Sequence, residues 1–435
     1  MTTTLNPFIA EAEQLSAARS TEPAWLAAAR LKALTSFNRL GFPTTRDEEW
    51  RFTSVAPIAD GSFTLARDGA ALTRADVDSY RWLTESAITL VFTDGVYRRD
   101  LSNLDGVPPG VQIGSLAAAL TEPAVERHLT TVADAKRQAF TALNTAFLAD
   151  GVFVHIPDGV ILRTPIHALF VTSSDAEPTM VHPRVLIVLG ANSQASIIES
   201  YESRHRTRSF TNVVTEVVAG ENASLHHYKI QRESTAGFHI GSIAAHAARN
   251  SALVFHSISL GGALVRNDVV VTLDGEGAIC TLNGVYLSDG SRLVDNHTTI
   301  DHAKPHCDSR EIYRGVLADK SRAVFNGKIV VQPDAQKTDA KQTSKALLLS
   351  PDAQINTKPQ LEIFADDVKC THGAAVGQMD DEAIFYLRAR GLDEGEARHM
   401  LIRAFAGEVL NQIPIESLRA RLDHELMQRL PEWTR

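Results

Sequence analysis

Residues 192–197, Asn-Ser-Gln-Ala-Ser-Ile, and residues 222–225, Asn-Ala-Ser-Leu, each lead from a turn into a β-rich run. The same order of a turn residue, small residues and an apolar run returns at residues 250–253 and 275–279. The small-residue triplets begin 28, 28 and 26 residues apart, at Ala195, Ala223, Ser251 and Gly277. A β period of about 20–30 residues with small residues at its turns predicts a parallel β-solenoid, in which each coil stacks on its neighbours.

Short runs of β-forming residues recur from Gly151 to Gly377, each beside Gly, Asn, Asp or Pro. The predicted strands are Val152–Ile156, Val185–Leu189, Val213–Val218, Ala252–Ile258, Val269–Leu273 and Ala323–Val331. A β-sandwich, with strands every 8–12 residues or so, is the alternative. The repeat unit is longer than a hairpin, which favours the solenoid. The dipeptides Asn283-Gly284 and Asn326-Gly327 nevertheless have the form of hairpin turns.

Helical patterns flank this β region, so we expect a mainly β protein with a mixed helical region over 1–150, a β core over 151–377 and a helical region over 378–435. The N-terminal region is predicted to contain helices at Ala24–Arg39 and Glu122–Leu148 and short strands at Ile88–Phe92 and Val107–Ile113. Gly41 and Asp150-Gly151 are typical of the residues that end such helices.

Three helices are predicted after the β region, at Asp380–Arg390, at Glu394–Gln412 with Asp393 and Glu396 as a capping box, and from about residue 416 onward. The second helix presents Leu401, Phe405 and Val409 on one face. The third presents a narrow apolar stripe, Leu418, Leu422, Leu426 and Leu430. Such a stripe most often packs against its own domain, and the alternative is a docking face for a partner.

The composition indicates a soluble protein of a reducing compartment, which we place in the cytoplasm. A net charge of −9 and a pI near 6.0 disfavour nucleic-acid binding. No apolar run approaches the roughly 18 residues of a membrane span, and residues 1–10 lack the features of a secretory signal. Three separated cysteines, Cys280, Cys307 and Cys370, form no Cys-x-x-Cys pair and no evident disulfide framework.

Motifs of self-sufficient catalysis are missing from the sequence. There is no phosphate-binding loop and no Gly-x-Ser-x-Gly nucleophile elbow. His424-Glu425 lacks the second histidine of a zinc-protease helix. Two Glu-x-x-His pairs occur, Glu202 with His205 and Glu396 with His399, but only the second lies on a predicted helix. A di-iron bundle requires helical pairs plus further glutamates, so solvated Glu–His pairs are the better interpretation.

Two segments contain residue types that bind soft or borderline metals. The first contains His297, His302, His306 and Cys307, which on a solenoid coil would alternate between faces. The second is Asp366–Gly373, where Cys370 and His372 would point the same way from an extended strand. A thiolate beside an imidazole can bind iron, zinc or a cluster edge, or act as a nucleophile pair. Structural Cys and His are the default interpretation of both segments.

Four segments resemble the SufD family of the SUF iron–sulfur cluster assembly machinery. They are Gly41–Thr53 (GFPTTRDEEWRFT), Asn356–Ile363 (NTKPQLEI), Asp366–Gly373 (DDVKCTHG) and Phe385–Gly391 (FYLRARG). They occur in the family's order and cover essentially the whole chain. SufD is favoured over the related SufB subunits by the shorter length of the chain and by two short sequences, Arg-Asp-Glu-Glu-Trp and Lys-Pro-Gln-Leu-Glu-Ile.

The resemblance implies a right-handed parallel β-helix and a non-catalytic scaffold role. It also implies a heterodimer with SufB and docking of SufC, an ABC-type ATPase, on the C-terminal helices, for which Leu401, Phe405 and Val409 are our candidates. His372, with Cys370 as an accessory, would lie where a transient iron or iron–sulfur cluster forms at the SufB interface, and no cofactor would be tightly bound. An exposed terminal edge would also allow a homodimer.

Two other functions stay open from the residues themselves. Solenoids often carry enzyme sites, so a β-helix enzyme acting on polysaccharide or acyl groups is one alternative. A metal-storage protein or metallochaperone that uses the histidines of residues 297–307 is the other.

Overall fold

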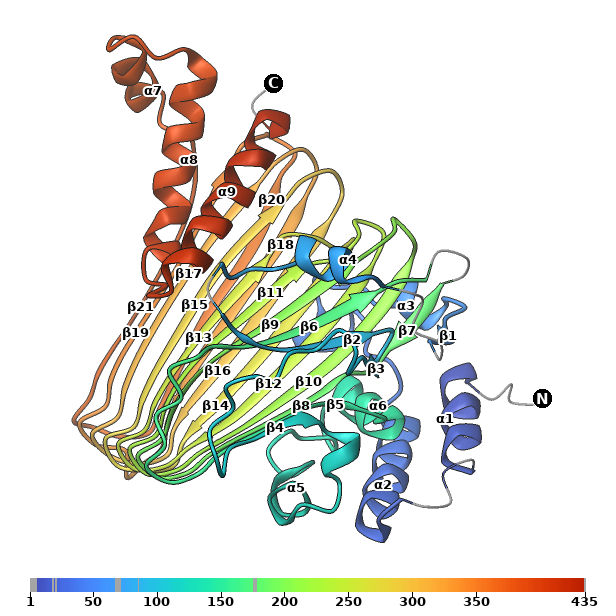
Figure 1. Cartoon of the computed structure of the whole chain (residues 1–435). Helices are drawn as coiled ribbons and strands as arrows, with labels where there is room; N and C mark the ends of the chain where they lie inside the picture. Colours follow the sequence, from blue (N-terminus) through green and yellow to red (C-terminus); the bar gives the residue numbers. More distant parts are fainter. Residues whose placement is uncertain are drawn as a thin grey trace.

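The structure is a computed structural model that describes residues 6–17, 19, 22–66, 72–84, 86–174 and 178–433, with side chains to residue 429. Its centre is a flattened parallel β-solenoid made of two sheets, with helices at both ends of the chain (Figure 1). From β8 onward, successive strands alternate between the sheets, so each coil of chain contributes one strand to each sheet. The predicted solenoid is confirmed, and the β-sandwich alternative is wrong.

Sheet A contains, in spatial order, β20 (Gln354–Ile363), β18 (Arg322–Val331), β16 (Leu293–His302), β14 (Leu264–Leu273), β12 (Phe238–Ala247), β10 (Ser209–Ala219), β8 (Arg184–Leu189), β5 (Gly151–Ile156) and β4 (Gln112–Ser115), with β7 (Thr179–Val181) beside β10 and β1 (Thr64–Leu65) beside β7. Sheet B contains β21 (Lys369–Gln378), β19 (Asp339–Leu348), β17 (Asp308–Leu317), β15 (Ile279–Ser288), β13 (Ala252–Ser259), β11 (Ser224–Arg232), β9 (Gln194–Ser203), β6 (Ile166–Thr172), β2 (Ile88–Thr93) and β3 (Val96–Tyr97). The pairs β2–β3 and β4–β5 are antiparallel, and the solenoid strands pair in parallel.

The coils are less regular than the sequence repeat predicts. Ala195 pairs with Leu225, Leu225 with Leu253, and Leu253 with Cys280, which gives steps of 30, 28 and 27 residues. The predicted steps of 28, 28 and 26 are therefore wrong for the first and third coils. All four paired side chains are buried in the core. A one-residue slip would turn each core residue outward, so the core fixes the register and the turns absorb the difference in length.

A residue with positive φ stands two positions before most strands of sheet B. These residues are Asn192 (58°), Asn222 (57°), Asn250 (53°), Gly277 (72°), His306 (60°) and Lys337 (62°). The asparagine turns were predicted, whereas the fourth turn has its positive φ at Gly277 instead of the predicted Gly275. In the later coils a histidine and a lysine take this position, and neither is a turn signal in a sequence. This explains why the repeat fades after residue 279.

Inward-facing apolar side chains of both sheets fill the solenoid. They include Ile197, Val213, Leu225, Phe255, Val271, Leu282, Ile300 and Phe325. Tyr313 pairs with Gly284 and Tyr286 with Gly315 on neighbouring strands. A Cβ at Gly284 would lie 2.1 Å from the Tyr313 ring, and one at Gly315 would lie 2.2 Å from the Tyr286 ring. Both glycines therefore leave space for an aromatic ring.

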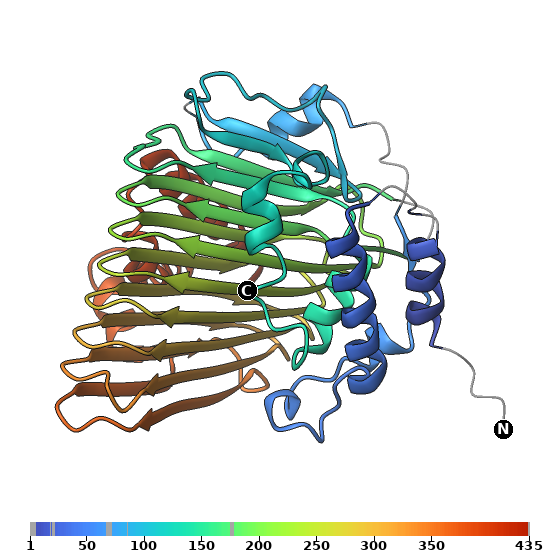
Figure 2. The same ribbon diagram turned by 90° about the horizontal axis from the view of Figure 1, so that it is seen from below.

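The N-terminal helices lie beside the strands of the solenoid (Figure 2). They are α1 (Pro7–Ala17), α2 (Ala24–Leu40), the 3-10 helix η1 (Glu48–Trp50), α3 (Ala56–Ala59), α4 (Arg74–Ser79), the 3-10 helix η2 (Ala117–Ala119), α5 (Pro123–His128) and α6 (Ala139–Phe147). The helix predicted over Ala24–Arg39 is confirmed as α2. The strand predicted over Val107–Ile113 is confirmed only at its end, where β4 begins at Gln112.

The single helix predicted over Glu122–Leu148 is wrong, because residues 129–138 separate α5 from α6. At this break Thr130 has a φ of 65°. The carboxylate of Glu216 on β10 accepts hydrogen bonds from the backbone N–H groups of Thr130, Val132 and Ala133 at 2.8–3.0 Å. A buried charge on the solenoid thus takes donors that a continuous helix would have used, and local periodicity contains no trace of it.

Three C-terminal helices, α7 (Asp381–Arg388), α8 (Glu394–Leu410) and α9 (Glu416–Trp433), follow the solenoid. The predicted capping box of Asp393 and Glu396 begins α8. Leu418, Leu422 and Leu426 are buried in a cluster with residues of sheet B, as expected for a stripe that packs on its own domain. The side chain of Leu430 lies outside the described residues. No helix of the described chain is long and apolar enough to cross a membrane.

Candidate functional site

Cys370 and His372 lie on β21, the last strand of sheet B, at the end of the solenoid (Figure 1). Cys370 pairs with Ala340 of β19, which is buried in the interior. His372 pairs with Gln342, which is also buried. Because side chains alternate along a strand, Cys370 and His372 point the same way, as predicted, and their pairing places both on the interior side of sheet B. No further strand covers them within the described residues, so they lie at the open mouth of the solenoid.

The two side chains differ in their surroundings. Cys370 is half-buried and packs against a small apolar cluster that contains Val331 and Ala365. Burial is the main reason that the pKa of its thiol is raised above the ordinary value. His372 is exposed. The pair is therefore a protonated thiol beside an accessible imidazole, and a nearby positive charge or a metal ion would be needed to form the thiolate.

A polar ladder leads from the interior to His372. Gln342 Nε2 donates a 2.7 Å hydrogen bond to Glu311 Oε2 one coil deeper. Burial raises the pKa of Glu311 to about 7, against the effect of hydrogen bonds from Thr298 and Gln342. Gln342 Oε1 is buried and has no hydrogen-bond partner. The residue paired with His372 therefore carries a buried, unsatisfied acceptor.

Residues 44–53, which we call the strap, cross the outer face of sheet A and contact four successive coils. The contacts join the Trp50 ring to the guanidinium of Arg266 at 3.8 Å, Thr53 to Asp295 at 2.5 Å, Glu49 to Asn326 at 3.1 Å and Glu48 to Lys358 at 2.5 Å. These partners belong to β14, β16, β18 and β20, respectively. The strap therefore ties the middle of the solenoid to its last coil in sheet A.

His297 is clamped between two carboxylates beneath the strap. Its Nδ1 lies 3.2 Å from Glu49 Oε2, and its Nε2 lies 3.0 Å from Asp295 Oδ1. Burial lowers the pKa of His297, but the charge of Asp295 and the hydrogen bonds to Asp295 and Glu49 outweigh burial and raise it to about 9. The ring is therefore a cation at neutral pH. Both nitrogens carry protons, so His297 is unsuited to bind a metal here.

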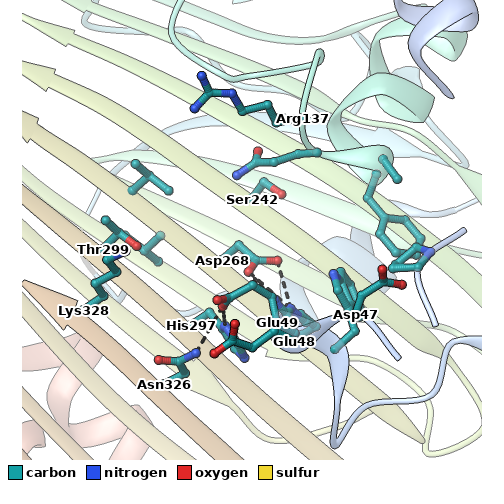
Figure 3. Close-up of a pocket in the computed structure, with 18 of the residues that line it drawn as sticks. Asp47, Glu48, Glu49, Arg137, Ser242, Asp268, His297, Thr299, Asn326 and Lys328 are labelled. Carbon is teal, nitrogen blue, oxygen red and sulfur yellow. Dashed lines mark hydrogen bonds and ion pairs between the residues drawn. The ribbon is translucent and has the colours of Figure 1, made fainter. Parts of the chain in front are cut away.

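A cleft of about 590 Å³ lies beside the strap on the outer face of sheet A (Figure 3). Its charged groups are paired with one another or with neighbours: Asp268 with Arg266, Lys328 with Glu362, and Glu48 with Lys358. Figure 3 shows Glu49, His297 and Asn326 converging at its edge. These mutual contacts are structural, because they hold the strap to sheet A.

The other histidines and the cysteine near His297 diverge. His302 Nε2 faces Ser309 at 2.9 Å inside the solenoid, while His306 takes the positive-φ turn position. The thiol of Cys307 is buried and donates to the carbonyl oxygen of Gly275 at 3.3 Å. Across the described part of the chain, no group of three or more His, Cys, Asp and Glu side chains is arranged to hold a metal ion. The 297–307 segment is thus not one ligand set.

Two models of protein families match the chain. One, described as the SUF system FeS cluster assembly SufBD core domain, matches residues 170–405. The other, described as the SufBD protein N-terminal region, matches residues 5–168. The chain belongs to the SufBD family.

Curated relatives agree with this membership. A SufBD family iron–sulfur cluster assembly protein of Synechocystis is 36% identical over 412 residues, which are 92% of this chain and 90% of the relative. The iron–sulfur cluster assembly protein SufD of Escherichia coli is 32% identical over 396 residues, 90% of each chain. The protein of the same name in Bacillus subtilis is 26% identical over 420 residues, 92% of this chain and 93% of the relative.

Two of the segments that resemble the SufD family are distant in sequence and meet in space. Glu48 of the segment 41–53 bonds Lys358 of the segment 356–363. The segment 366–373 leads into β21, the last strand of sheet B at this end of the solenoid. Sequence reasoning identified these segments but missed the contacts of Arg266, Asp295 and His297 with the strap. A charged residue on alternate positions of a strand gives no sign of a partner about 250 residues away.

The predicted docking residues on α8 are only partly accessible. Val409 is buried against sheet B, and Leu401 and Phe405 are half-buried. The exposed apolar side chains of this region are instead Phe385 and Tyr386 of α7 and Met400 of α8, at 74%, 56% and 48% exposure. Figure 1 shows α7 and the first turns of α8 projecting beyond the sheets.

Proposed function

We propose that this chain is a non-catalytic, cytoplasmic scaffold subunit of SUF-type iron–sulfur cluster assembly that pairs with a SufB-type chain at the open end of its solenoid. One observation carries the proposal: β21, with Cys370 and His372, has a strand partner on one side only within the described residues. An unpaired strand edge is a template for another chain. The E. coli and B. subtilis relatives are both named as iron–sulfur cluster assembly proteins.

The chemistry of the mouth suits iron as a transient substrate. A thiolate and an imidazole are ligands that iron accepts in clusters. Cys370 and His372 supply at most two ligands, so a complete site needs donors from the partner chain. Because burial raises the pKa of Cys370, the free subunit holds a neutral thiol and would bind iron weakly until the partner's charges arrive.

The proposed contact for a SufC-type ABC ATPase is the projecting surface of Phe385, Tyr386 and Met400. Large exposed apolar and aromatic side chains are the usual anchors of protein interfaces. Val409 and the buried leucines of α9 hold the helices on sheet B, so they position the contact surface without meeting the partner. The ATPase would thus bind at the tip of a helical arm, made of α7 and the first turns of α8. The base of this arm is fixed to the solenoid by the packing of α8 and α9 on sheet B.

The first prediction concerns the mouth. In reconstituted assembly with both partners, His372→Ala is expected to lower the yield of cluster at least several-fold, and Cys370→Ala less, because Cys370 is half-buried and protonated. His246→Ala, at a surface histidine of β12 paired with Asp274, is the matched control. Size-exclusion chromatography verifies that each complex is intact. Cluster yields equal to that of the control would remove His372 from the mechanism.

The second prediction concerns the helical arm. Phe385→Ser with Tyr386→Ser is expected to weaken binding of the ATPase by at least about tenfold, as for loss of an aromatic anchor. Leu31→Ser on α2, which is 67% exposed, is the control. Isothermal titration measures binding directly. Deleting residues 380–435 is the poorer experiment, because it would uncover the buried face of sheet B. Unchanged affinity in the double variant would place the ATPase elsewhere.

A further inference from the structure

Arg232, at the end of β11, joins three parts of the chain that are far apart in sequence. Its Nε donates to Glu202 Oε2 of β9 at 2.9 Å, and its Nη1 donates to Glu425 Oε1 of α9 at 2.7 Å. Its guanidinium lies 4.9 Å from the ring centre of Trp82, in the segment between α4 and β2. Trp82 Nε1 in turn donates to Glu202 Oε1 at 3.1 Å. We call these four residues the Arg232 joint.

The joint shares one cation between two largely buried carboxylates. The exposed fractions of the side chains are 2% for Glu202, 17% for Arg232 and 10% for Glu425. Burial raises the pKa of Glu202 to about 7; Arg232 and Trp82 oppose the rise, and the charge of Glu425 adds to it. Glu202 therefore changes charge near neutral pH, and its proton affinity depends on the presence of α9.

Both sides of the contact between α9 and the solenoid keep a partner if it opens. Without α9, Arg232 retains the carboxylate of Glu202 and the face of Trp82. Glu425 retains Arg421 of its own helix, at 3.0 Å. Removing one partner of a buried ion pair is normally costly because it leaves an uncompensated charge. At the Arg232 joint this cost is avoided, so the ion pair can open at low cost.

The anchor of the N-terminal helices is built differently. Arg184 of β8 and Glu216 of β10 are both fully buried and bond at 2.6 Å. Glu216 also receives the three N–H groups at the break before α6. Asn144 on α6 accepts from Arg184 at 2.9 Å. Opening this contact would leave buried charges and amides without partners, whereas opening the contact between Glu425 and Arg232 would not.

Movement at the tip of the arm would reach the joint. Arg403 of α8 holds Asp423 of α9 through two hydrogen bonds of 2.8 and 2.7 Å. Asp423 lies two residues before Glu425. Further along α8, the carboxylate of Glu408 accepts two hydrogen bonds from Arg314 of β17, at 2.9 and 2.6 Å. Glu408 is half-exposed. A displacement of α7 and α8 therefore moves the segment of α9 that carries Glu425.

We propose that the Arg232 joint is a conformational relay in which displacement of α9 withdraws Glu425 from Arg232 and leaves Arg232 to Glu202 and Trp82. The relay transmits movement of the C-terminal helices to the N-terminal segment around Trp82. This inference rests on the proposed binding of an ATPase to those helices, which supplies the displacement. Its physical core, the coupling of Glu425 to Trp82 through Arg232 and Glu202, is a property of the isolated chain.

The test therefore uses the isolated full chain. Glu425→Gln mimics withdrawal of the α9 charge, Glu202→Gln removes the titrating group, and Glu416→Gln, at an exposed residue of the same helix, is the matched control. The emission of Trp82, taken as the difference from a Trp82→Phe chain, is followed from pH 5 to pH 9. Hydrogen exchange of the peptide 78–84 is followed at pH 7.5. The charged or titratable groups that face Glu202 are Arg232 from β11, Glu425 from α9 and Tyr80 from the segment after α4.

We expect the Trp82 emission of the unaltered chain to change with a midpoint near pH 7, that of Glu202→Gln to be flat, and that of Glu425→Gln to have a lower midpoint. Exchange in 78–84 should fall several-fold in Glu425→Gln, because Arg232 is then held by Glu202 and Trp82 alone, and stay unchanged in Glu416→Gln. A midpoint and an exchange rate in Glu425→Gln equal to those of Glu416→Gln would overturn the relay. ATPase binding, measured separately, decides the proposed function, so the two failures are distinct.

Discussion

Charged side chains, and His297 above all, hold the strap to sheet A. Arg266 and Asp295 are almost fully buried, and Glu49 and His297 complete a chain of alternating charges. The pKa of Asp295 falls to about 2, because Arg266 and His297 outweigh the opposing effect of burial. Paired buried charges add little net stability, but they penalise wrong arrangements because an unpaired member is costly. The strap is therefore specified in one position.

The third prediction follows from the raised pKa of His297. A histidine whose pKa rises from 6.5 to about 9 on folding stabilises the fold fully below pH 6.5, and this contribution is lost as pH rises through 9. We therefore expect the strap to loosen between pH 7 and pH 10. His297→Gln should reduce the fall of the thermal midpoint over this range, and His246→Gln, at a surface histidine, should not.

Nuclear magnetic resonance titration of the His297 ring is the direct check. A pKa near 9 agrees with two flanking carboxylates. A pKa at or below 6.5 would contradict the strap geometry described above.

At the scale of a coil, the tyrosine–glycine pairs control how closely neighbouring strands fit. The fourth prediction is that Gly315→Ala lowers the free energy of unfolding by about 1–3 kcal/mol, because its Cβ would overlap the buried ring of Tyr286. Gly114→Ala on β4 is the control, since nothing lies within 4 Å of its added Cβ. Chemical denaturation of both variants decides the matter. Equal stability of the two would mean that the ring of Tyr286 can move aside.

The sequence predicted the class of each element better than its length or register. The solenoid, α2 and the capping box of α8 follow from local signals, because asparagine turns, apolar periodicity and capping residues act over a few positions. The coil steps were wrong where turn length varied, since register is decided by which residue reaches the core. The break after α5 depends on Glu216, a residue about 85 positions away that no local pattern includes.

The site was predictable to a similar degree. Cys370 and His372 point the same way because strand alternation is a local rule. Their place at the open end could be predicted only from the number of coils. The sequence repeat that would give this number fades once His306 and Lys337 take the turn positions. The accessibility of α8 depended on which of its faces meets sheet B. The face of α8 that contains Val409 packs on sheet B, and the exposed apolar side chains lie mainly on α7.

At the scale of the whole molecule, the two ends of the solenoid have different tasks. The N-terminal end is covered by α5, α6 and the antiparallel strands β3 and β4, with Arg184 and Glu216 as a fixed anchor. The other end leaves β20 and β21 with one strand neighbour each in the described sheets. The strap braces this end from sheet A, and the helical arm leaves it from sheet B. We infer that the molecule is built to present one edge and one arm to partners.

The fifth prediction follows from this division, and native mass spectrometry of the chain coexpressed with a SufB-type chain and a SufC-type ATPase tests it most directly. We expect a complex that contains all three. Val376→Lys, at a half-exposed residue of β21, should release the SufB-type chain and keep the ATPase, because it places a charge at the open edge and leaves the arm intact. A chain that stays alone beside both partners, or a Val376→Lys variant that keeps the SufB-type chain, would contradict the account.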